Sequence, residues 1–351
     1  MKNTLLSVPA RDGYPLEAML SVPEGEVKKL VLYVNGSGPV TYHIKRQLPD
    51  GKWFRYHDLF AEEFTRRGIA YCRYSTRGAK DGDTAPYFVD IDYDAYRTYL
   101  PHNSVGDVEC LADAIRAEYP DISVYLLGWS EGTIIAPRVV LNGRTKIDGL
   151  LLCGYCNENL RDTLIWQLQG NYELITFRRL FDHDRRGYIS KADFEEDRYQ
   201  ARQELFGDQT FEQLDLDGDG KLTAEDLAPR TIDFLNDILS AIERGDDEWT
   251  KQNHALHLTT GWFREHFSLE SNKILLPKLD LPIHVFSGEY DAMTPQFYAE
   301  AIERRFAELG KTNLTVRYFE NLDHDLNILR YFIKGELSDG IKCLLETAES
   351  L

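Results

Sequence analysis

One stretch, residues 122–141, constrains the fold of this chain more than any other. Its first six residues are a hydrophobic run expected to form a strand, and residues 133–141 have the pattern of a helix. Between them lies Gly128-Trp129-Ser130-Glu131-Gly132, a Gly-x-Ser-x-Gly sequence. A strand that enters a helix through such a sequence makes a tight turn, and the turn exposes the serine hydroxyl at the N-terminus of the helix. The stretch therefore predicts an α/β fold with Ser130 at a functional position.

Strands and helices alternate on both sides of a central segment. Before it, strands are expected at 3–8, 16–22, 30–34, 69–74, 122–127 and 149–153, and helices at 56–67, 105–118 and 133–141. After it, strands are expected at 282–287 and 314–319, and helices at 295–309 and 326–347. Repeated strand–helix units predict an α/β class with a mostly parallel sheet and helices on both faces. We expect a core made of residues 1–156 and 265–351, with residues 157–264 inserted as a helical cap.

The charge of the chain limits its partners. The formal net charge is −18, which argues against nucleic acid or an anionic membrane surface, because both require basic patches. Residues 158–259 hold 23 Asp and Glu against 12 Lys and Arg, so this segment contributes −11 of the total. The expected partner is a small molecule, and the inserted segment either uses or tolerates its concentrated carboxylates.

Compartment and membrane association follow from two further features. No run of about 18 uncharged apolar residues is present, so no membrane-spanning helix is expected. The five cysteines are an odd number and lie in apolar contexts, which suits reduced thiols in a reducing compartment. Cys153 and Cys156 form a single CxxC without a second pair, and we interpret them as structural. A cytoplasmic protein is expected.

A serine acts as a nucleophile when a histidine accepts its proton and a carboxylate orients the histidine. Of nine histidines, only His324 lies in a short loop between a late strand and the last helix. The preceding strand, 282–287, is followed by Gly288-Glu289-Tyr290-Asp291. We predict Ser130 as the nucleophile, His324 as the base and Asp291 as the acid, with Glu289 as the alternative acid. Each residue alone has a simpler structural explanation, but all three follow predicted strands, in the order used by elbow-type hydrolases.

An oxyanion hole needs two N–H donors directed at the developing negative charge. One is expected from Glu131, the residue after the nucleophile. The other is expected from the loop Asn35-Gly36-Ser37-Gly38-Pro39, which follows the strand at 30–34. Its glycines allow the backbone to approach a substrate, and the Ser37 amide is the best candidate.

These segments together resemble the α/β-hydrolase superfamily. The resemblance is carried by the Asn35–Pro39 loop, the Gly128–Gly132 elbow, Gly288–Asp291, Asp323-His324 and Arg73-Tyr74-Ser75-Thr76-Arg77-Gly78. It is similar to esterase or peptidase-like serine hydrolases with a Gly-Ser-Gly-Pro oxyanion loop, and it covers about residues 1–156 and 265–351. Asn35 stands where many relatives have His, and Ser75 stands where the Tyr-Asp-x-Arg-Gly pattern usually has Asp. Neither position belongs to the predicted triad, so the two departures bear on which subfamily the chain resembles and not on the predicted chemistry.

The inserted segment contains a loop that resembles an EF-hand. Residues 215–226 read DLDGDGKLTAED, with acids at loop positions 1, 3, 5 and 12, a glycine at 6 and an aliphatic residue at 8. Position 12 is an aspartate in place of the usual bidentate glutamate, so Mg²⁺ is an alternative to Ca²⁺. The expected ligands are Asp215, Asp217, Asp219, Lys221 and Asp226, with Lys221 contributing through its backbone carbonyl.

A second copy of this pattern lies 33 residues upstream, at 182–193. It would offer Asp182, Asp184, Tyr188 and Asp193, but Arg186 at position 5 replaces an oxygen ligand with a cation. EF-hands pair through the short strand around position 8, so Ile189 and Leu222 are expected to face each other. The sequence thus predicts a paired unit with one good site and one doubtful site.

The complete prediction is a cytoplasmic serine hydrolase that cleaves an ester, thioester or amide of a small substrate through an acyl-enzyme. It carries a calcium-binding cap and needs no organic cofactor. An insertion at this point of the fold lies above the strand ends, where it is expected to act as a lid. Five cap aromatics are candidates for an acyl pocket: Trp166, Tyr172, Trp249, Trp262 and Phe263. Two alternatives remain open, a serine peptidase of the same fold and a non-catalytic, calcium-responsive binding protein.

Overall fold

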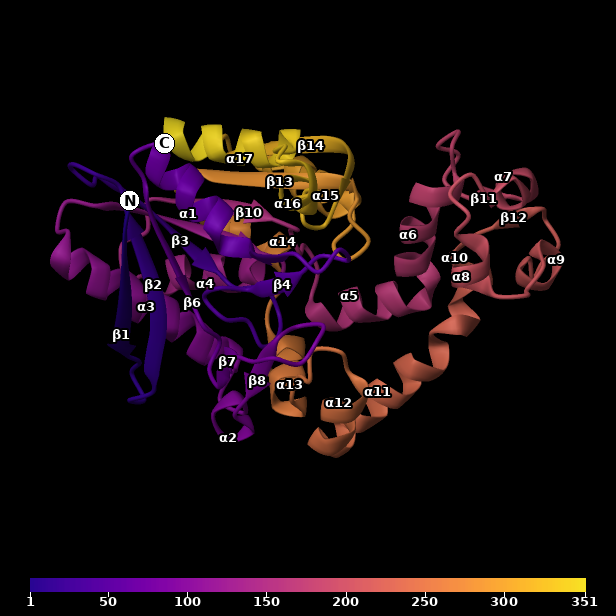
Figure 1. The fold of residues 1–351 in the computed structure, drawn as a ribbon, viewed down its shortest axis with the longest axis horizontal. Helices are drawn as coiled ribbons and strands as arrows, with labels where there is room; N and C mark the ends of the chain where they lie inside the picture. The colour runs from indigo at the N-terminus through magenta and orange to yellow at the C-terminus, as the bar shows by residue number, and fades with distance from the viewer.

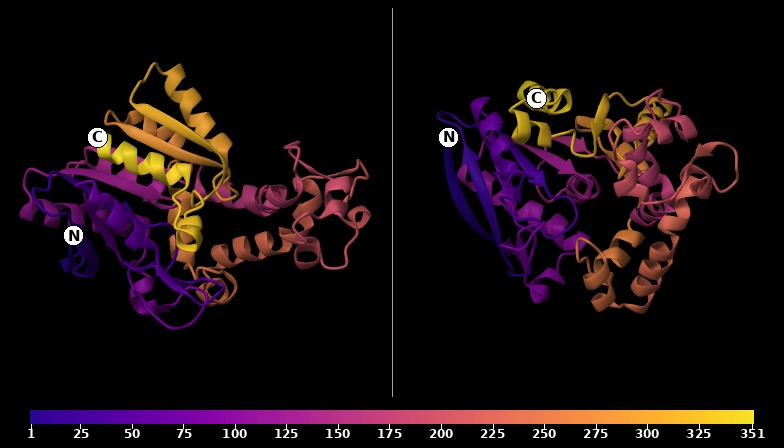
Figure 2. Two further views of the ribbon diagram at one scale, coloured as in Figure 1. Left: turned by 45° about the horizontal axis from the view of Figure 1, so that its top comes forward. Right: turned by 45° about the vertical axis from the view of Figure 1, so that its right-hand side comes forward.

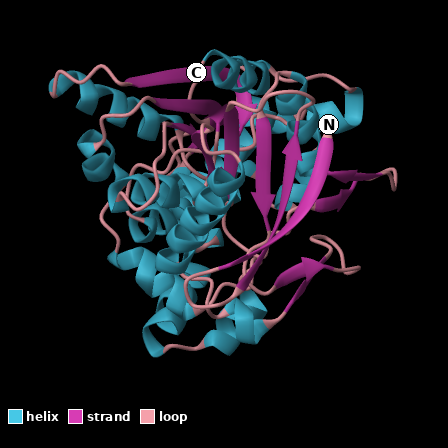
Figure 3. Cartoon of the chain, turned by 90° about the vertical axis from the view of Figure 1, so that its left-hand side faces the viewer, coloured by secondary structure: helices cyan, strands magenta, loops and turns pink.

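The computed structural model describes residues 1–351 and contains an eight-stranded sheet with helices on both faces (Figures 1 and 3). The strand order is β1-β2-β6-β3-β9-β10-β13-β14, in which β1 and β2 are antiparallel to their neighbours and the other pairs are parallel. The strands of this sheet are β1 Lys2–Pro9, β2 Pro15–Val22, β3 Lys29–Val34, β6 Ala70–Tyr74, β9 Ser123–Trp129, β10 Gly149–Cys153, β13 Ile283–Tyr290 and β14 Leu314–Asp323. None of the helices has both the length and the apolar character that a membrane crossing requires.

The two faces of the sheet are covered by different helices because strand side chains alternate between faces. In β3, Leu30 and Leu32 pack into one core, and Val31 and Tyr33 pack into the other. The helices on the first face are α3 Pro101–Glu118, α4 Gly132–Asn142 and α15 Gln296–Glu308. Those on the second face are α1 Tyr56–Arg66 and α17 Asp339–Ser350. The predicted fold class, a mostly parallel sheet between two helical layers, is confirmed.

Residues 160–268, in the chain between β10 and β13, form the helical cap (Figure 1). Its helices are α5 Leu160–Trp166, α6 Tyr172–Phe181, α7 Lys191–Glu196, α8 Arg202–Phe206, α9 Phe211–Leu214, α10 Ala224–Leu227, α11 Ile232–Arg244, α12 Asp247–Asn253 and α13 Thr260–Ser268. Short helices α14 Asn272–Leu275 and α16 Leu329–Lys334 lie outside it. The left view in Figure 2 shows the segment from α6 to α10 projecting beyond the sheet, with α11 leading back toward it. Helix α6 keeps contact with β13.

The segment from α6 to α10 is a pair of EF-hand-like loops. Ile189 in β11 (Ile189–Ser190) pairs antiparallel with Leu222 in β12 (Lys221–Leu222), as predicted. Both side chains are fully buried in a small core that is separate from the two sheet cores. Phenylalanines from the flanking helices complete this core: Phe177, Phe181, Phe194, Phe206 and Phe211. The cap therefore contains a unit with its own hydrophobic core.

The structure corrects the predicted elements in two places. The single closing helix expected at 326–347 is wrong, because Gly335 adopts a left-handed conformation (φ 71°) and separates α16 from α17. The structure also contains two hairpins and one short helix that the sequence does not predict: β4 Lys45–Gln47 with β5 Trp53–Arg55, β7 Ala79–Asp81 with β8 Val89–Ile91, and α2 Tyr93–Tyr96. Each of these strands has three residues and the helix has four, too few to produce a recognisable periodicity.

Candidate active site and metal loops

Ser130 lies in the sharp turn between β9 and α4, in a left-handed conformation (φ 55°) that non-glycine residues seldom adopt. The two flanking glycines make this turn possible. A Cβ on Gly132 would lie 2.1 Å from the Val34 carbonyl oxygen, and one on Gly128 would lie 2.5 Å from the Gly132 carbonyl oxygen. The Ser130 amide donates a hydrogen bond to the Cys153 carbonyl at 2.9 Å. The local backbone therefore has the strained strand–turn–helix geometry that the sequence predicts.

His324 and Asp291 are in direct contact. The distance from His324 Nδ1 to Asp291 Oδ1 is 2.8 Å, and Asp291 is 1% exposed. Asp291 also accepts hydrogen bonds from the Met293 and Thr294 amides at 3.0 and 2.7 Å, and from the Thr294 hydroxyl at 2.8 Å. The alternative acid, Glu289, instead accepts a bond from the Asn321 amide. The geometry thus brings Asp291 to the histidine and leaves Glu289 outside the pair.

The imidazole of His324 fits against a glycine that the sequence did not single out. Gly154 directly follows β10 and has a left-handed backbone (φ 60°). A Cβ at this position would lie 2.5 Å from His324 Cε1 and 2.9 Å from Nδ1. The Trp129 indole donates to the backbone carbonyl of His324 at 3.1 Å. Since Trp129 precedes Ser130, this bond ties the loop of the histidine to the turn of the serine.

The charges around His324 shift its titration. Burial alone would lower the pKa, but the adjacent Asp291 carboxylate, assisted by Asp325 and Asp323, outweighs burial and raises the pKa of His324 to about 9. A histidine accepts a proton only in its neutral form. The acid–base behaviour of the site is therefore expected to appear at alkaline pH.

We expect kcat/KM to rise with pH and to level off only above about pH 9, because this parameter reports the essential base of the free enzyme. Stability should change in the opposite direction. A pKa raised above the ordinary 6.5 contributes stability below that value, which is lost as the pH rises through about 9. The measurements are kcat/KM and denaturant unfolding as functions of pH. A rise of kcat/KM with its midpoint near pH 6.5 would contradict the prediction.

The predicted oxyanion loop lies beside the serine. A Cβ on Gly36 would lie 3.5 Å from Ser130 Cβ and 3.3 Å from the Trp129 carbonyl oxygen, so the loop backbone passes directly against the turn. Ser37 and Glu131 line the same cavity as Ser130 and His324. The arrangement allows the Ser37 and Glu131 amides to serve as the two donors.

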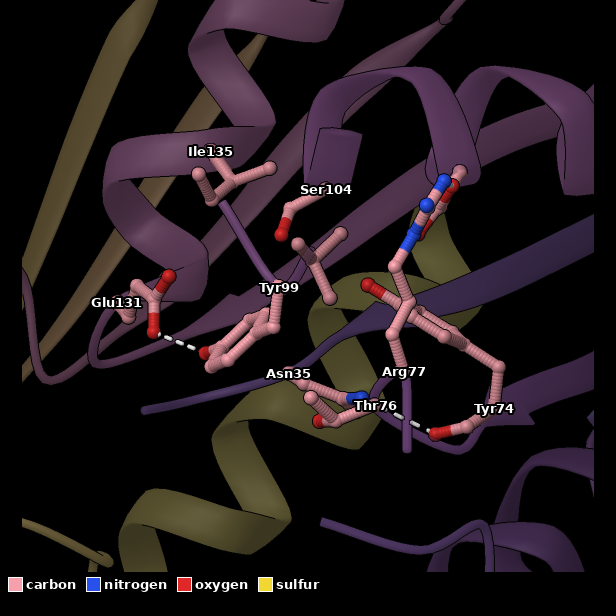
Figure 4. Close-up of a pocket in the computed structure, with 10 residues that line it drawn as sticks. Asn35, Tyr74, Thr76, Arg77, Tyr99, Ser104, Glu131 and Ile135 are labelled. Carbon is pink, nitrogen blue, oxygen red and sulfur yellow. Dashed lines mark hydrogen bonds and ion pairs between the residues drawn. The ribbon is translucent and has the colours of Figure 1, made fainter. Parts of the chain in front are cut away.

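The side chain of Glu131 has a structural position that the sequence did not reveal. It is 3% exposed and accepts hydrogen bonds from Tyr99, from the Trp262 indole at 3.2 Å and from His266 Nε2 at 2.9 Å. Figure 4 shows the Tyr99 hydroxyl pointing at the carboxylate from the loop before α3. Trp262 and His266 belong to α13, so this buried network fastens the base of the cap to the serine turn. These partners lie about 130 residues away in the chain, and no local pattern connects them.

A cavity of about 840 Å³ opens above Ser130 and His324. Of its 34 lining residues 20 are hydrophobic, so most of its wall is apolar. Of the five aromatics expected to line it, Trp262 and Phe263 do so. The other three do not: Trp166 packs on Phe297 and Tyr298, Trp249 packs on Phe234, and Tyr172 is exposed. The correction follows from the cap helices, which turn these three side chains toward other neighbours.

The second EF-hand-like loop brings three predicted ligands together. One carboxylate oxygen from each of Asp215, Asp217 and Asp219 lies within 4.8 Å of the others. Clustered carboxylate oxygens suit a hard cation such as Ca²⁺. Asp226 is outside this group of three, and its carboxylate accepts bonds from the Leu216 and Thr223 amides at 2.9 and 2.8 Å. Lys221 is at the seventh position and begins β12, with its ammonium 3.3 Å from Asp219.

The first loop has a cation of its own. Arg186 contacts Asp193, and its guanidinium also lies 3.7 Å from Asp184. Asp182 accepts a bond from Arg178 Nε at 3.0 Å and another from the Gly187 amide. Each of the three acids is thus paired with an arginine. Tyr188, at the seventh position, packs beneath the Arg186 guanidinium. The acids of this loop are therefore compensated by arginines of the protein itself.

Similar folds occur among solved structures, over nearly the whole chain. An esterase from Exiguobacterium antarcticum is 15% identical with a TM-score of 0.51, covering 99% of this chain and 98% of its own. A thermostable carboxyl esterase from Bacillus coagulans is 16% identical with a TM-score of 0.53 and 99% coverage of both chains. An α/β hydrolase from Penicillium is 12% identical with a TM-score of 0.53 and 100% coverage of both.

The sequence comparisons are narrower. The EF hand family model matches residues 207–228, which include the second loop. No curated protein matches the chain in sequence. At the low identities above, the structural likeness concerns the fold alone. The chain therefore has the α/β-hydrolase fold, with an EF-hand-like pair in its cap.

Proposed function

We propose that the protein is a serine hydrolase that cleaves esters of small, largely apolar acyl groups through an acyl-enzyme. The observation that carries this proposal is the 2.8 Å contact between buried Asp291 and His324, which lines the same cavity as Ser130. The esterase names of two structural neighbours favour esters over amides. Thioesters and amides react by the same chemistry and are the secondary substrates of this proposal.

The proposed reaction has two halves. Ser130 Oγ attacks the substrate carbonyl while His324 accepts the hydroxyl proton, and Asp291 stabilises the imidazolium that forms. The Ser37 and Glu131 amides hold the negative oxygen of the tetrahedral intermediate. His324 then gives the proton to the departing alcohol, and a water molecule, activated by the same histidine, releases the acid and restores Ser130.

The apolar wall predicts a dependence on acyl chain length. For p-nitrophenyl esters, each additional buried CH₂ contributes about 0.8 kcal/mol, so kcat/KM should rise roughly fourfold per CH₂ until the cavity is filled. The measurement is kcat/KM across straight-chain esters of increasing length, with aminoacyl-naphthylamides as the comparison. Equal rates at all lengths, or faster cleavage of the amides, would contradict the proposed ester specificity.

We further propose that the second EF-hand-like loop binds one Ca²⁺ ion, with Mg²⁺ as a weaker alternative. The support is the group of three carboxylates in this loop, together with the EF hand match over the same residues. The proposed ligands are Asp215, Asp217 and Asp219, the Lys221 carbonyl and Asp226. In this role the ion stabilises the cap, which would act as the lid over the cavity.

Calorimetric titration should find one calcium ion per chain, since Arg186 already occupies the first loop. Binding to the native state raises stability by about 2.7 kcal/mol at a hundredfold excess over Kd, so the melting temperature should also rise relative to chelator. Asp217→Asn should weaken binding, and the matched change Asp184→Asn in the first loop should not. Two ions per chain, or an unchanged melting temperature, would contradict the assignment.

We also propose a cytoplasmic location. The support comes from the cysteines: all five are free, and Cys72, Cys153 and Cys156 are buried in the fold. Free buried thiols are typical of a reducing compartment.

A further inference from the structure

The loop that carries His324 is a strained turn. The turn follows β14, and both Leu326 and Asn327 adopt left-handed conformations (φ 51° and 54°). Non-glycine residues hold such conformations only where their surroundings impose them. Within the turn, Asp323 Oδ1 accepts bonds from the Asp325 and Asn327 amides at 3.1 and 2.8 Å. The position of His324 therefore depends on the groups that hold Asp323 and Asn327.

Three side chains from outside the turn hold it. The Trp129 indole binds the His324 carbonyl, and the Ser338 hydroxyl binds the Leu326 carbonyl at 2.6 Å. The third is Arg179, from the cap. Its two terminal nitrogens donate to Asp323 Oδ2 and to Asn327 Oδ1, each at 3.1 Å. Because one planar guanidinium spans both ends of the turn, it fixes their separation as well as neutralising a charge.

Arg179 also belongs to the last turn of α6, the helix that leads into the first EF-hand-like loop. Its neighbour Arg178 binds Asp182, the first residue of that loop. In Figure 1, α6 runs beside the end of the sheet that carries β13 and β14. One turn of helix is thus attached to the EF-hand-like pair and to the loop of the histidine. Arg185, from the first EF-hand-like loop, also donates to the side chains of Glu320 and Asn321, at 3.3 and 3.1 Å.

We propose that Arg179 is a positioning residue of the active site: it holds the Asp323–Asn327 turn so that His324 meets Ser130 correctly, and it makes the histidine depend on the EF-hand-like pair. This inference rests on the proposed role of His324 as the base. Arg179 is 42% exposed and Asp323 is 36% exposed, so a gain in stability alone would not explain the contact. Its role lies in geometry and in the charge it places beside Asp323.

The test is the rate at which a fluorophosphonate labels Ser130, which requires no knowledge of the natural substrate. Arg179→Gln should lower this rate about tenfold, because small displacements of a catalytic group have large effects. It should also move the pH dependence of labelling to higher pH. The carboxylates acting on His324 are Asp291, Asp325 and Asp323, and removing Arg179 leaves Asp323 uncompensated.

Three comparisons complete the experiment. Arg179→Lys should restore part of the labelling rate, because lysine keeps the positive charge but lacks the planar guanidinium that binds Asp323 and Asn327 together. Arg198→Gln is the matched control, since this exposed cap arginine pairs only with Glu196. In Asp323→Asn, adding Arg179→Gln should have little further effect on the rate.

The outcomes separate two failures. Wild-type protein that is not labelled overturns the proposed function itself. Wild-type protein that is labelled, together with Arg179→Gln labelled at the same rate and with the same pH dependence, overturns only the positioning role. A lower melting temperature with an unchanged labelling rate would also overturn it, because that result indicates a purely structural contact.

Discussion

Ser130→Ala is expected to lower kcat for ester hydrolysis by roughly 10⁴ to 10⁶-fold, because it removes the attacking oxygen. The fold should persist, since alanine occupies the same left-handed position at a cost similar to that of serine. Residues that act as a unit are not additive, so Ser130→Ala/His324→Ala should lose little more than the single change. The measurement is kcat on p-nitrophenyl esters together with the melting temperature.

The matched control for this change is Ser268→Ala, at an exposed position at the end of α13. It should retain wild-type kcat. Residual activity in Ser130→Ala within tenfold of wild type would mean that another group attacks the ester. A double variant much slower than either single change would mean that the serine and the histidine do not act in one step.

Gly154→Ala is expected to lower kcat/KM by about 10²-fold, the effect typical of a misplacement near 1 Å. The added Cβ would lie 2.5 Å from His324 Cε1, so the imidazole must move away from its place beside Asp291. Alanine in a left-handed conformation also costs about 1 kcal/mol of stability. The two effects need separate measurements, kcat/KM for the first and the free energy of unfolding for the second.

Gly143→Ala separates these effects. Gly143 has nearly the same left-handed backbone (φ 62°) at the end of α4, and a Cβ there would have no neighbour within 4 Å. It should lose similar stability and keep full kcat/KM. If both variants lose the same activity, the contact with the imidazole is not what matters at Gly154.

Much of the core could be predicted because its determinants are local. Hydrophobic runs between turn residues placed the sheet strands to within a few residues, and the predicted strand at 149–153 coincides with β10. Parallel strands end at one edge of a sheet, so the residues that follow them, Asp291 and His324, meet there. The EF-hand register likewise predicted the pairing of Ile189 with Leu222.

The remainder depends on contacts between distant residues. The sequence shows that Gly154 is a glycine, but only the fold shows the His324 ring against it. Glu131 binds Trp262 and His266 of the cap, more than a hundred residues along the chain. Arg179 of the cap binds Asp323, which also lies more than a hundred residues away in sequence. The prediction that the cap aromatics line the cavity rests on their residue type and their place in the insertion, whereas their orientation depends on how each helix packs. A pattern of residue types contains no information about such orientations.

The central claim is that Ser130 is an activated nucleophile, and covalent labelling tests it most directly. Wild-type protein would be treated with a fluorophosphonate and its intact mass measured, followed by mapping of the modified peptide. We predict one adduct per chain, located on Ser130, and none on Ser130→Ala. A wild-type protein that stays unlabelled, or a Ser130→Ala protein labelled to the same extent, would contradict the account.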